Sequence, residues 1–213
     1  MMKTLLIITT KDDPKFLDEA LSTLKDDLAV IVINDGFDDS GEVLKVARKY
    51  NVSYIAKKWK GLTDSWNIGY KHFVDLKYEH CIICNDDVRF TKGFSTPLIE
   101  GTELFDLVGP LTNQPGHQSL QYSDGVLKKS KRTYVSLPHI NGFCFAFSKG
   151  IEKFKYSDEL LFDPSNINIQ NEDDLCSRIR NHGGMVAMCS TSFVFHYKDV
   201  TLKRYKKDKK TLK

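Results

Sequence analysis

The sequence has 213 residues, of which 41% are apolar and 28% charged, so the chain can bury a sizeable core as one domain. No apolar run approaches the roughly 20 residues that a membrane-spanning helix needs. The apolar run at the N-terminus is also too short for a secretory leader, and we therefore expect a soluble or peripheral protein.

The distribution of charge and the cysteine content further limit the class of protein and its expected partners. The net charge is +3, but residues 198–213 carry eight Lys or Arg against two Asp, so the rest of the chain is slightly acidic. We expect a basic tail at residues 201–213, which leaves open a peripheral contact with anionic lipid; a nucleic-acid partner is not expected, because few aromatic residues interleave the charges. The five cysteines lie in apolar stretches and are expected to be buried free thiols of a reducing compartment.

In chain order, the first half alternates strand-like apolar runs with amphipathic helical patterns, which is typical of a parallel sheet covered by helices. Strand runs are expected at 4–9, 28–33, 52–56 and 81–84, and helices from Asp13-Pro14, at about 40–50, and after Gly61-Leu62-Thr63. Three of these strands end in polar residues. In open α/β sheets the ligand lies at the carboxyl ends of the strands, so the site is expected there.

The second half indicates a more antiparallel arrangement. Strands are expected at 134–137 and 143–147, a loop at 112–119, and a hairpin through 123–125. A helix over 172–182 is followed by two expected closing strands, 185–189 and 193–197. We predict one domain over 1–200, with a nucleotide-binding half (1–90) and an acceptor or catalytic half (91–200).

Asn85-Asp86-Asp87 is the strongest chemical signal, since it follows a buried strand. Two adjacent carboxylates repel in surroundings poor in water unless a cation or hydrogen-bond donors meet them. Mg²⁺ and Mn²⁺ are commonly held by one or two carboxylates together with substrate phosphates. The alternative is a solvated turn. Asp35 likewise is either a nucleotide ligand or the first residue of an ordinary Asx-Gly turn.

Three acids, Glu172-Asp173-Asp174, occupy the first turn of the predicted helix. Acids there are favoured by the helix dipole, yet one of them can also serve as a general base. His196, on the polar face of the last strand, is either a hydrogen-bonded histidine or a ligand of the ion. Asn141-Gly142 is either a turn or part of the acceptor side.

The order of these segments along the chain resembles the family-2 glycosyltransferases of the GT-A fold. The match extends to about Thr201. Its motifs are Thr9-Thr10, Asn34-Asp35-Gly36, Gly61-Leu62-Thr63-Asp64-Ser65-Trp66-Asn67-Ile68-Gly69, Asn85-Asp86-Asp87, the strand from Asn141-Gly142 to Ser148, Phe162-Asp163, the segment from Glu172 to Arg178, and His196 with Thr201.

The resemblance implies an α/β GT-A fold, with a central, mixed but mostly parallel sheet flanked by helices. It also implies transfer of a sugar from a UDP-linked donor (UDP-glucose-like) to an acceptor hydroxyl, with inversion and with Mn²⁺ or Mg²⁺. The acceptor side is implied for Asn141 and Gly142, the metal for Asp87 and His196, and the base for Glu172 or Asp173. The nucleotide-sugar-binding residues implied are Thr9, Asp35, Asn67, Asp86 and Asp87.

Three departures from the family pattern qualify this assignment. Asn85 replaces the usual first Asp, which moves the metal onto Asp87. Trp66 stands where the family often has Arg. Glu172 and Asp173 both fit the position of the base, depending on how the segment is aligned.

The compact size and the lack of an apolar run long enough to span a membrane suit a cytoplasmic enzyme, or a domain of a larger viral or bacterial glycosyltransferase that acts in the host cytoplasm if it is viral. Two rival functions remain. A nucleotidyltransferase that makes sugar nucleotides would carry a Gly-rich phosphate loop after the first strand, where this chain has Thr9-Thr10-Lys11-Asp12-Asp13. A non-catalytic nucleotide-sugar-binding module would not need the acids at 172–174.

Overall fold

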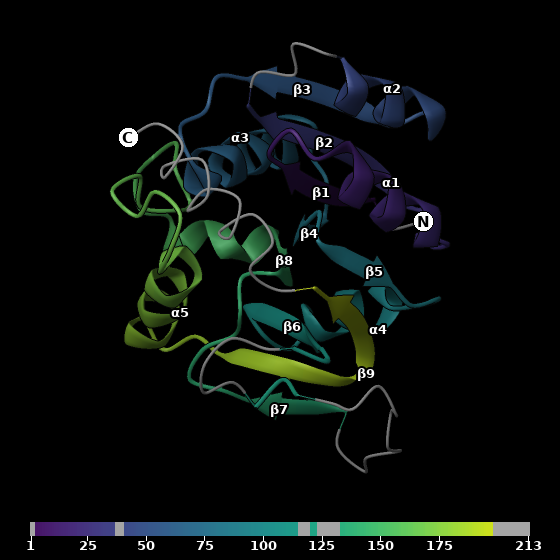
Figure 1. Ribbon diagram of the computed structural model, residues 1–213. Coiled ribbons are helices and arrows are strands. Elements are labelled where there is room, and N and C mark those ends of the chain that lie inside the picture. Colours follow the sequence, from purple (N-terminus) through teal and green to yellow (C-terminus); the bar gives the residue numbers. More distant parts are fainter. Residues whose placement is uncertain (1–2, 37–40, 115–119, 123–132, 198–213) are drawn as a thin grey trace, which may run out of the picture.

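A computed structural model describes residues 3–36, 41–114, 120–122 and 133–197, and shows one twisted sheet between layers of helices (Figure 1). Its strand order is β3-β2-β1-β4-β8-β6-β9-β5, with β7 paired to β9. The strands are β1 (Thr4–Thr10), β2 (Ala29–Asp35), β3 (Ser53–Lys57), β4 (His80–Asn85), β5 (Val88–Phe90), β6 (Leu107–Leu111), β7 (Tyr134–Ser136), β8 (Cys144–Ser148) and β9 (Val186–His196).

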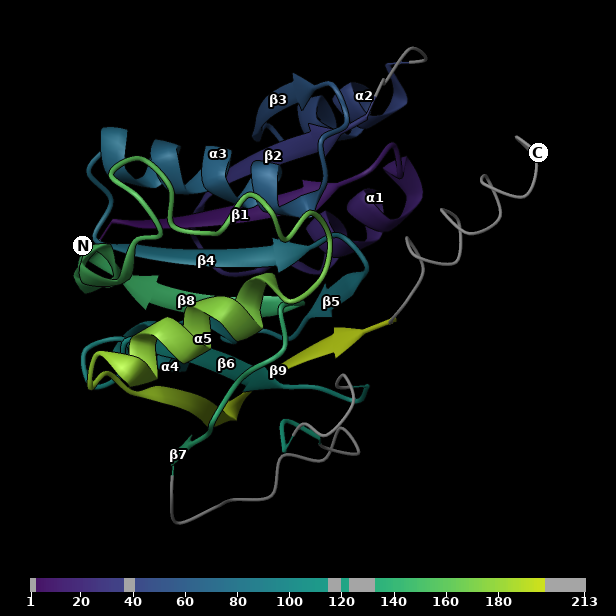
Figure 2. The ribbon, with the colours of Figure 1, turned by 90° about the vertical axis from the view of Figure 1, so that its left-hand side faces the viewer.

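The helices cover both faces of this sheet. α3 and α5 lie on one face, and α1, α2 and α4 on the other (Figures 1 and 2). They are α1 (Pro14–Thr23), α2 (Glu42–Lys49), α3 (Leu62–Asp75), α4 (Ser95–Gly101) and α5 (Asn171–Asn181), with a 3-10 helix η1 (Lys149–Phe154).

The sheet has a parallel part and a mixed part, which differ in the direction of their strands. β3, β2, β1 and β4 are parallel to one another, and β8 joins β4 in the antiparallel sense. β6 and β9 run parallel to each other, whereas β5 and β7 are antiparallel to β9. The carboxyl ends of β1, β2, β4 and β9 therefore share one edge of the sheet.

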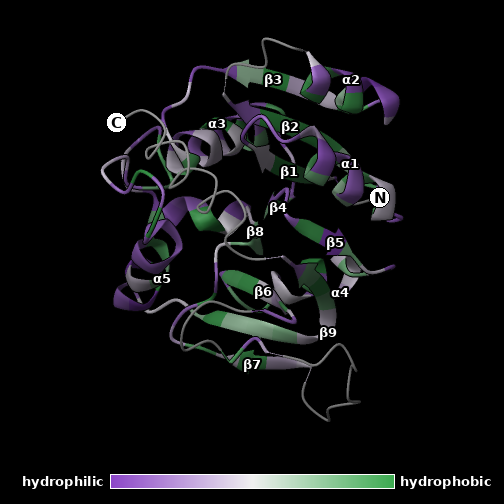
Figure 3. Ribbon diagram, in the orientation of Figure 1, coloured by the Kyte–Doolittle hydropathy of each residue, from purple (hydrophilic) through white to green (hydrophobic). Residues whose placement is uncertain are grey.

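Both faces of the central strands are buried, which explains their continuous apolar runs. Cys81 and Cys84 illustrate this, since they belong to core clusters on opposite faces. The apolar colouring of the strands and the hydrophilic outer sides of the helices show the same division (Figure 3). All five cysteines are free and buried, as expected.

Helix α1 shows why its segment folds locally as it does. Pro14 occupies the first turn, where a missing N–H costs nothing, and the Asp13 carboxylate accepts a hydrogen bond from the Phe16 N–H at 3.2 Å. Leu17, Ala20 and Leu21 are buried at helical spacing against the sheet.

The sequence-based prediction of the last strands was wrong in one respect. Residues 185–189 and 193–197 were expected as two strands, but β9 is continuous from Val186 to His196. The intervening Ser190, Thr191 and Ser192 fill a register shift opposite Pro110 and Leu111, and the Ser192 hydroxyl donates to the Phe94 carbonyl at 2.8 Å. A bulge of this kind keeps a polar interruption inside a strand.

Three short elements were not expected, namely β5, α4 and η1. The expected hairpin through 123–125 and the basic tail lie outside the described residues, as does most of the loop 112–119. Within the described part of the chain, no helix has both the length and the apolar character needed to cross a membrane.

Candidate active site

Polar residues at the carboxyl ends of β1 and β4 lie side by side. The register places Thr9 opposite Asn85, and the Thr10 hydroxyl donates to the Asp86 carboxylate at 2.5 Å. Asp86 is buried, and burial followed by the charge of Asp87 raises its pKa well above the usual value. The edge predicted from sequence thus holds buried acids, as a cation site would require.

Asp87 and His196 face each other because β5 begins immediately after Asp87 and pairs with the end of β9. Val88 is opposite His196, and the Tyr197 N–H donates to the Asp87 carbonyl at 2.9 Å. The His196 Nε2 and the Asp87 Oδ1 are 3.5 Å apart, with the two side chains only 12% and 8% exposed. The Asp87 Oδ1 is buried and has no hydrogen-bond partner.

The protonation of His196 is directed by its other ring nitrogen. His196 Nδ1 lies 3.1 Å from the Gln114 carbonyl oxygen, which can only accept, so Nδ1 carries the proton. In the neutral ring, Nε2 then presents a lone pair toward a carboxylate. Asn113 holds the backbone of this residue, accepting from its N–H at 2.8 Å, and the Phe143 ring stacks on the imidazole at 4.8 Å.

These contacts fit a divalent cation. With the ring neutral, the Nε2 lone pair and the Asp87 Oδ1 lie 3.5 Å apart, an arrangement that a positive charge between them would stabilise, and the Gln114 carbonyl orients the histidine as such partners do in metal sites. The described residues contain no group of three or more His, Cys, Asp or Glu side chains suited to a metal. Asp87 and His196 would therefore share the ion with oxygen atoms of a bound substrate.

Asp35, at the end of β2, is tied to the segment that precedes α3. Its carboxylate accepts from the N–H groups of Lys60 and Gly61, both at 2.9 Å, and forms an ion pair with Lys57, which also contacts Asp64 at 3.0 Å. Oδ2 accepts only from Gly61 among these donors, so it keeps the capacity to accept another.

The turn after Asp35 depends on a glycine. A Cβ on Gly36 would lie 2.0 Å from Asp12 Oδ2, and Asp12 exchanges two hydrogen bonds of 2.9 Å with Asn34. Gly36 therefore allows the loops after β1 and β2 to pack directly against each other.

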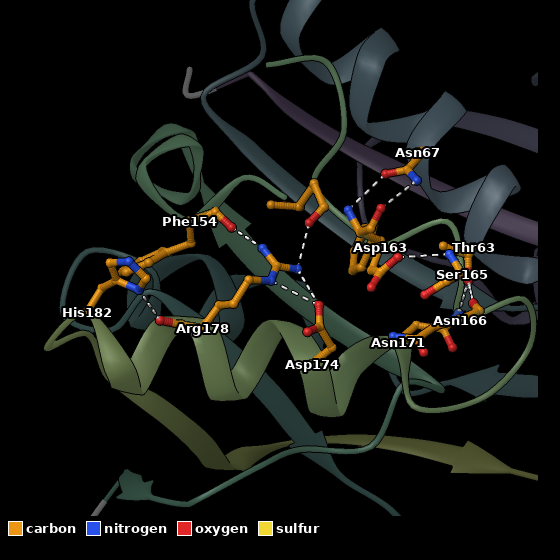
Figure 4. Close-up of polar contacts among 12 residues, drawn as sticks. Thr63, Asn67, Phe154, Asp163, Ser165, Asn166, Asn171, Asp174, Arg178 and His182 are labelled. Carbon is orange, nitrogen blue, oxygen red and sulfur yellow. Dashed lines mark hydrogen bonds and ion pairs between the residues drawn. The ribbon is translucent and has the colours of Figure 1, made fainter. Parts of the chain in front are cut away.

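Asn67 lies on α3, and its side-chain amide binds both backbone groups of Phe162. Its Nδ2 donates to the Phe162 carbonyl at 3.0 Å, and its Oδ1 accepts from the Phe162 N–H at 2.9 Å (Figure 4). This residue thus anchors the segment before α5, a role that the sequence did not indicate.

The three acids of α5 have different surroundings. Asp174 pairs with Arg178, which also donates to the Phe154 and Leu161 carbonyls (Figure 4). Asp173 is exposed to solvent. Glu172 lies against Gly142, whose N–H donates to its Oε1 at 3.1 Å.

The surroundings of Glu172 oppose its negative charge. Burial raises its pKa, and the nearby Asp173 raises it further, whereas the backbone N–H groups of Gly142 and of Glu172 itself, together with His139, lower it. Gly142 is required for this contact, since a Cβ there would lie 2.8 Å from the Trp66 ring and 2.9 Å from Glu172 Cδ. The acid therefore meets the segment expected on the acceptor side.

Gln121 was missed by the sequence analysis. It is fully buried, and its Oε1 accepts from the Asn141 N–H at 2.7 Å. A polar residue between two loops carries no periodic pattern, so nothing in the sequence singles it out.

Comparison with solved structures identifies the fold. The chain superposes on GalNAc-T7, in a crystal structure with UDP, GalNAc and Mn²⁺, with a TM-score of 0.71 at 16% identity, over 92% of this chain and 44% of that one. TarS from S. aureus (residues 1–349) superposes with a TM-score of 0.59 at 13% identity, over 93% of this chain and 61% of that one. The mannosyltransferase PcManGT from Pyrobaculum calidifontis, in complex with GDP-Man and Mn²⁺, superposes with a TM-score of 0.64 at 13% identity, over 91% of this chain and 56% of that one.

The chain thus spans about half the length of these structures, and it has the GT-A glycosyltransferase fold, as predicted. A sequence model of glycosyl transferase family 2 matches residues 5–156. The protein belongs to glycosyl transferase family 2. Comparison with curated proteins finds no match.

Proposed function

We propose that this family member transfers a sugar from a UDP-sugar, with UDP-glucose as the first candidate, to an acceptor hydroxyl, with inversion and in the presence of Mn²⁺ or Mg²⁺. The observation that carries the proposal is the pair formed by Asp87 and His196 at the carboxyl edge of the sheet, in which the buried Asp87 Oδ1 lies 3.5 Å from the His196 Nε2. GalNAc-T7 and PcManGT, which share the fold, were crystallised with Mn²⁺ and a nucleotide or nucleotide sugar, which supports the same chemistry here.

The donor would occupy the ends of β1, β2 and β4. Thr9 and Asp35 would contact the uridine, with Asp35 Oδ2 accepting a further N–H or O–H, and Asp86 would approach the ribose or the cation. Asn67 would border this site through the segment that it anchors. A divalent ion bound to Asp87, His196 and the diphosphate would offset the negative charge that grows on the departing UDP.

Glu172 would act as the general base. Its Oε1 is held by the Gly142 N–H, and Asn141 and Gly142 would border the acceptor. The carboxylate would take the proton of the acceptor hydroxyl as that oxygen attacks the anomeric carbon from the face opposite to UDP. The new glycosidic bond forms while the bond to the diphosphate oxygen breaks, so the configuration inverts without a covalent enzyme intermediate.

Calorimetry tests the donor site. UDP is expected to bind at least tenfold more tightly with Mn²⁺ than with excess chelator, and more tightly than GDP under the same conditions. His196→Ala and Asp87→Asn should each abolish the gain from Mn²⁺ while leaving metal-free binding unchanged, because neither side chain is assigned to the uridine. Equal affinity with and without Mn²⁺ in the parent protein would contradict the metal assignment, and tighter GDP binding would contradict the donor.

A further inference from the structure

Gln121 is a buried polar side chain outside any helix or strand. It is 0% exposed, and its backbone carbonyl accepts from the Thr112 N–H at 2.8 Å. Burying an amide costs free energy unless its donors and acceptors are satisfied, so the direction of its hydrogen bonds shows what it holds in place.

Those bonds join the end of β6 to the turn before β8. Gln121 Nε2 donates to the Pro110 carbonyl at 2.8 Å. Its Oε1 accepts twice from Asn141, from the N–H at 2.7 Å and from Nδ2 at 3.1 Å. One side chain therefore fixes both the backbone and the side chain of Asn141.

Strand β6, which lies beside Gln121, leaves room for the side-chain amide of this residue. A Cβ on Gly109 would lie 2.5 Å from Gln121 Nε2. The backbone of Gly109 does not have the positive φ that favours glycine, so close approach of the amide is the reason for a residue without a side chain here.

Asn141 precedes Gly142, whose N–H donates to Glu172 Oε1 at 3.1 Å. Movement of the 141–142 turn would move that donor, and the Glu172 carboxylate with it. A continuous series of hydrogen bonds and one peptide unit thus leads from Gln121 to Glu172.

We propose that Gln121 is a positioning residue for sugar transfer, which holds the Asn141–Gly142 turn in the place where it orients the carboxylate of Glu172. The inference rests on the proposed function, in which Glu172 is the base. Gln121 itself need not touch the donor, because its partners lie on β6 and in the turn before β8 rather than at the ends of β1 and β2.

Gln121→Met keeps the length of the side chain and removes its hydrogen bonds. We expect kcat for transfer to fall at least tenfold, with the affinity for UDP and Mn²⁺ within twofold of the parent. Gly109→Ala is a second variant that should displace the same amide sterically and produce the same pattern more weakly. Thr102→Val is the matched control: it removes a buried hydroxyl that bonds His80 at the opposite end of β4, and should change stability alone.

A second measurement does not depend on catalysis. Titration of Glu172 by NMR, assigned with Glu172→Gln, should give a higher carboxyl pKa in Gln121→Met than in the parent, because the Gly142 N–H no longer stabilises the charged form. Thr102→Val should leave that pKa in place.

The two readouts separate the possible failures. If the parent transfers no sugar, the proposed function fails, and the Glu172 pKa still decides whether Gln121 positions this carboxylate. Parental kcat in folded Gln121→Met, or an unchanged Glu172 pKa, would overturn the proposal. So would a loss of kcat matched by a loss of UDP affinity, since that would indicate a general structural role.

Discussion

At the scale of single residues, the site depends on acids whose contacts differ although their positions in sequence are adjacent. Asp174 is neutralised by Arg178, Asp173 is exposed, and Glu172 is held against a backbone N–H in surroundings that raise its pKa. A base with a raised pKa binds the proton of a hydroxyl more readily than an exposed carboxylate does. Geometry and electrostatics therefore both favour Glu172 over Asp173 as the base.

Glu172→Gln is expected to lower the transfer rate about 10²- to 10⁴-fold, the usual loss for a general base, and to leave UDP affinity unchanged. In the parent, transfer should decline toward acid from a pH above the usual glutamate range, because the pKa of Glu172 is raised. Asp173→Asn is the matched control and should transfer at a near-parental rate. If Asp173→Asn is inactive while Glu172→Gln transfers normally, the base is Asp173.

Glu172→Gln, which should lower the transfer rate, is expected to raise the stability of the fold at neutral and alkaline pH. Because the folded pKa of Glu172 exceeds the unfolded value, its protonation stabilises the fold below about pH 4.3, and this contribution is lost as pH rises through the folded pKa. Thermal melts should therefore show Glu172→Gln equal to the parent near pH 4 and more stable at pH 8. A variant less stable than the parent at pH 8 would contradict this account.

At the scale of elements, the segment between η1 and α5 is held from two sides. Arg178 binds the Phe154 and Leu161 carbonyls from α5, while Asn67 binds both backbone groups of Phe162 from α3. The Thr63 hydroxyl accepts from Asn171 Nδ2 at 2.7 Å and so joins the starts of the two helices (Figure 4). The starts of α3 and α5 and the segment between η1 and α5 are thereby fixed relative to one another.

Asn67→Leu should destabilise the protein by about 1–3 kcal/mol for each Phe162 group left unpaired, and should increase hydrogen exchange in residues 155–170. Denaturant unfolding and exchange mass spectrometry measure these effects. Asn67→Ser is a smaller polar control that removes the same contacts without adding an apolar group. A loss of UDP affinity in a variant of parental stability would instead indicate that Asn67 binds the nucleotide directly.

Elements with a long periodic pattern were predictable from the sequence, and short or interrupted ones were not. β1, β2 and β4 have continuous apolar runs with clear polar ends, so these strands and the edge bearing Asp35 and Asp87 were predicted from sequence alone. β5 has three residues and becomes a strand only by pairing with β9. Ser190 to Ser192 separated two expected strands because the bulge that accommodates them belongs to the pairing with β6.

Site residues divide in a similar way. Glu172 stood out because it lies among three acids in the first turn of a predicted helix, and His196 because it lies on the polar face of a predicted strand. The contacts of Asn67 with Phe162 and of Gln121 with Asn141 each involve a loop that meets its partner only in three dimensions. Local sequence contains no signal for such contacts, since at least one partner of each pair lies in an irregular segment and the two partners are separated along the chain.

At the scale of the molecule, one sheet crosses the boundary between the expected nucleotide and acceptor halves. β4 pairs with β8 over Cys81 to Cys84, and Trp66 on α3 packs on Phe145 of β8 at 5.1 Å and on Phe162 at the same distance. Neither half can unfold without exposing the aromatic side chains of this contact, and burial of each such side chain contributes about 1.5–3 kcal/mol. The predicted single domain therefore implies a single cooperative transition.

Denaturant unfolding followed by tryptophan fluorescence and by far-UV circular dichroism should give coincident curves, because Trp66 lies at the junction of the two halves. The proposed donor site also draws on both halves, with Asp35 and Asp87 in the first and His196 in the second. UDP with Mn²⁺ at a hundred times Kd should then shift the whole transition by about 2.7 kcal/mol, without splitting it. His196→Ala is the control in which the gain from Mn²⁺ should vanish while the curves remain coincident. Two separated transitions, with UDP and Mn²⁺ stabilising only the first, would mean that residues 1–90 fold and bind the donor independently of the rest.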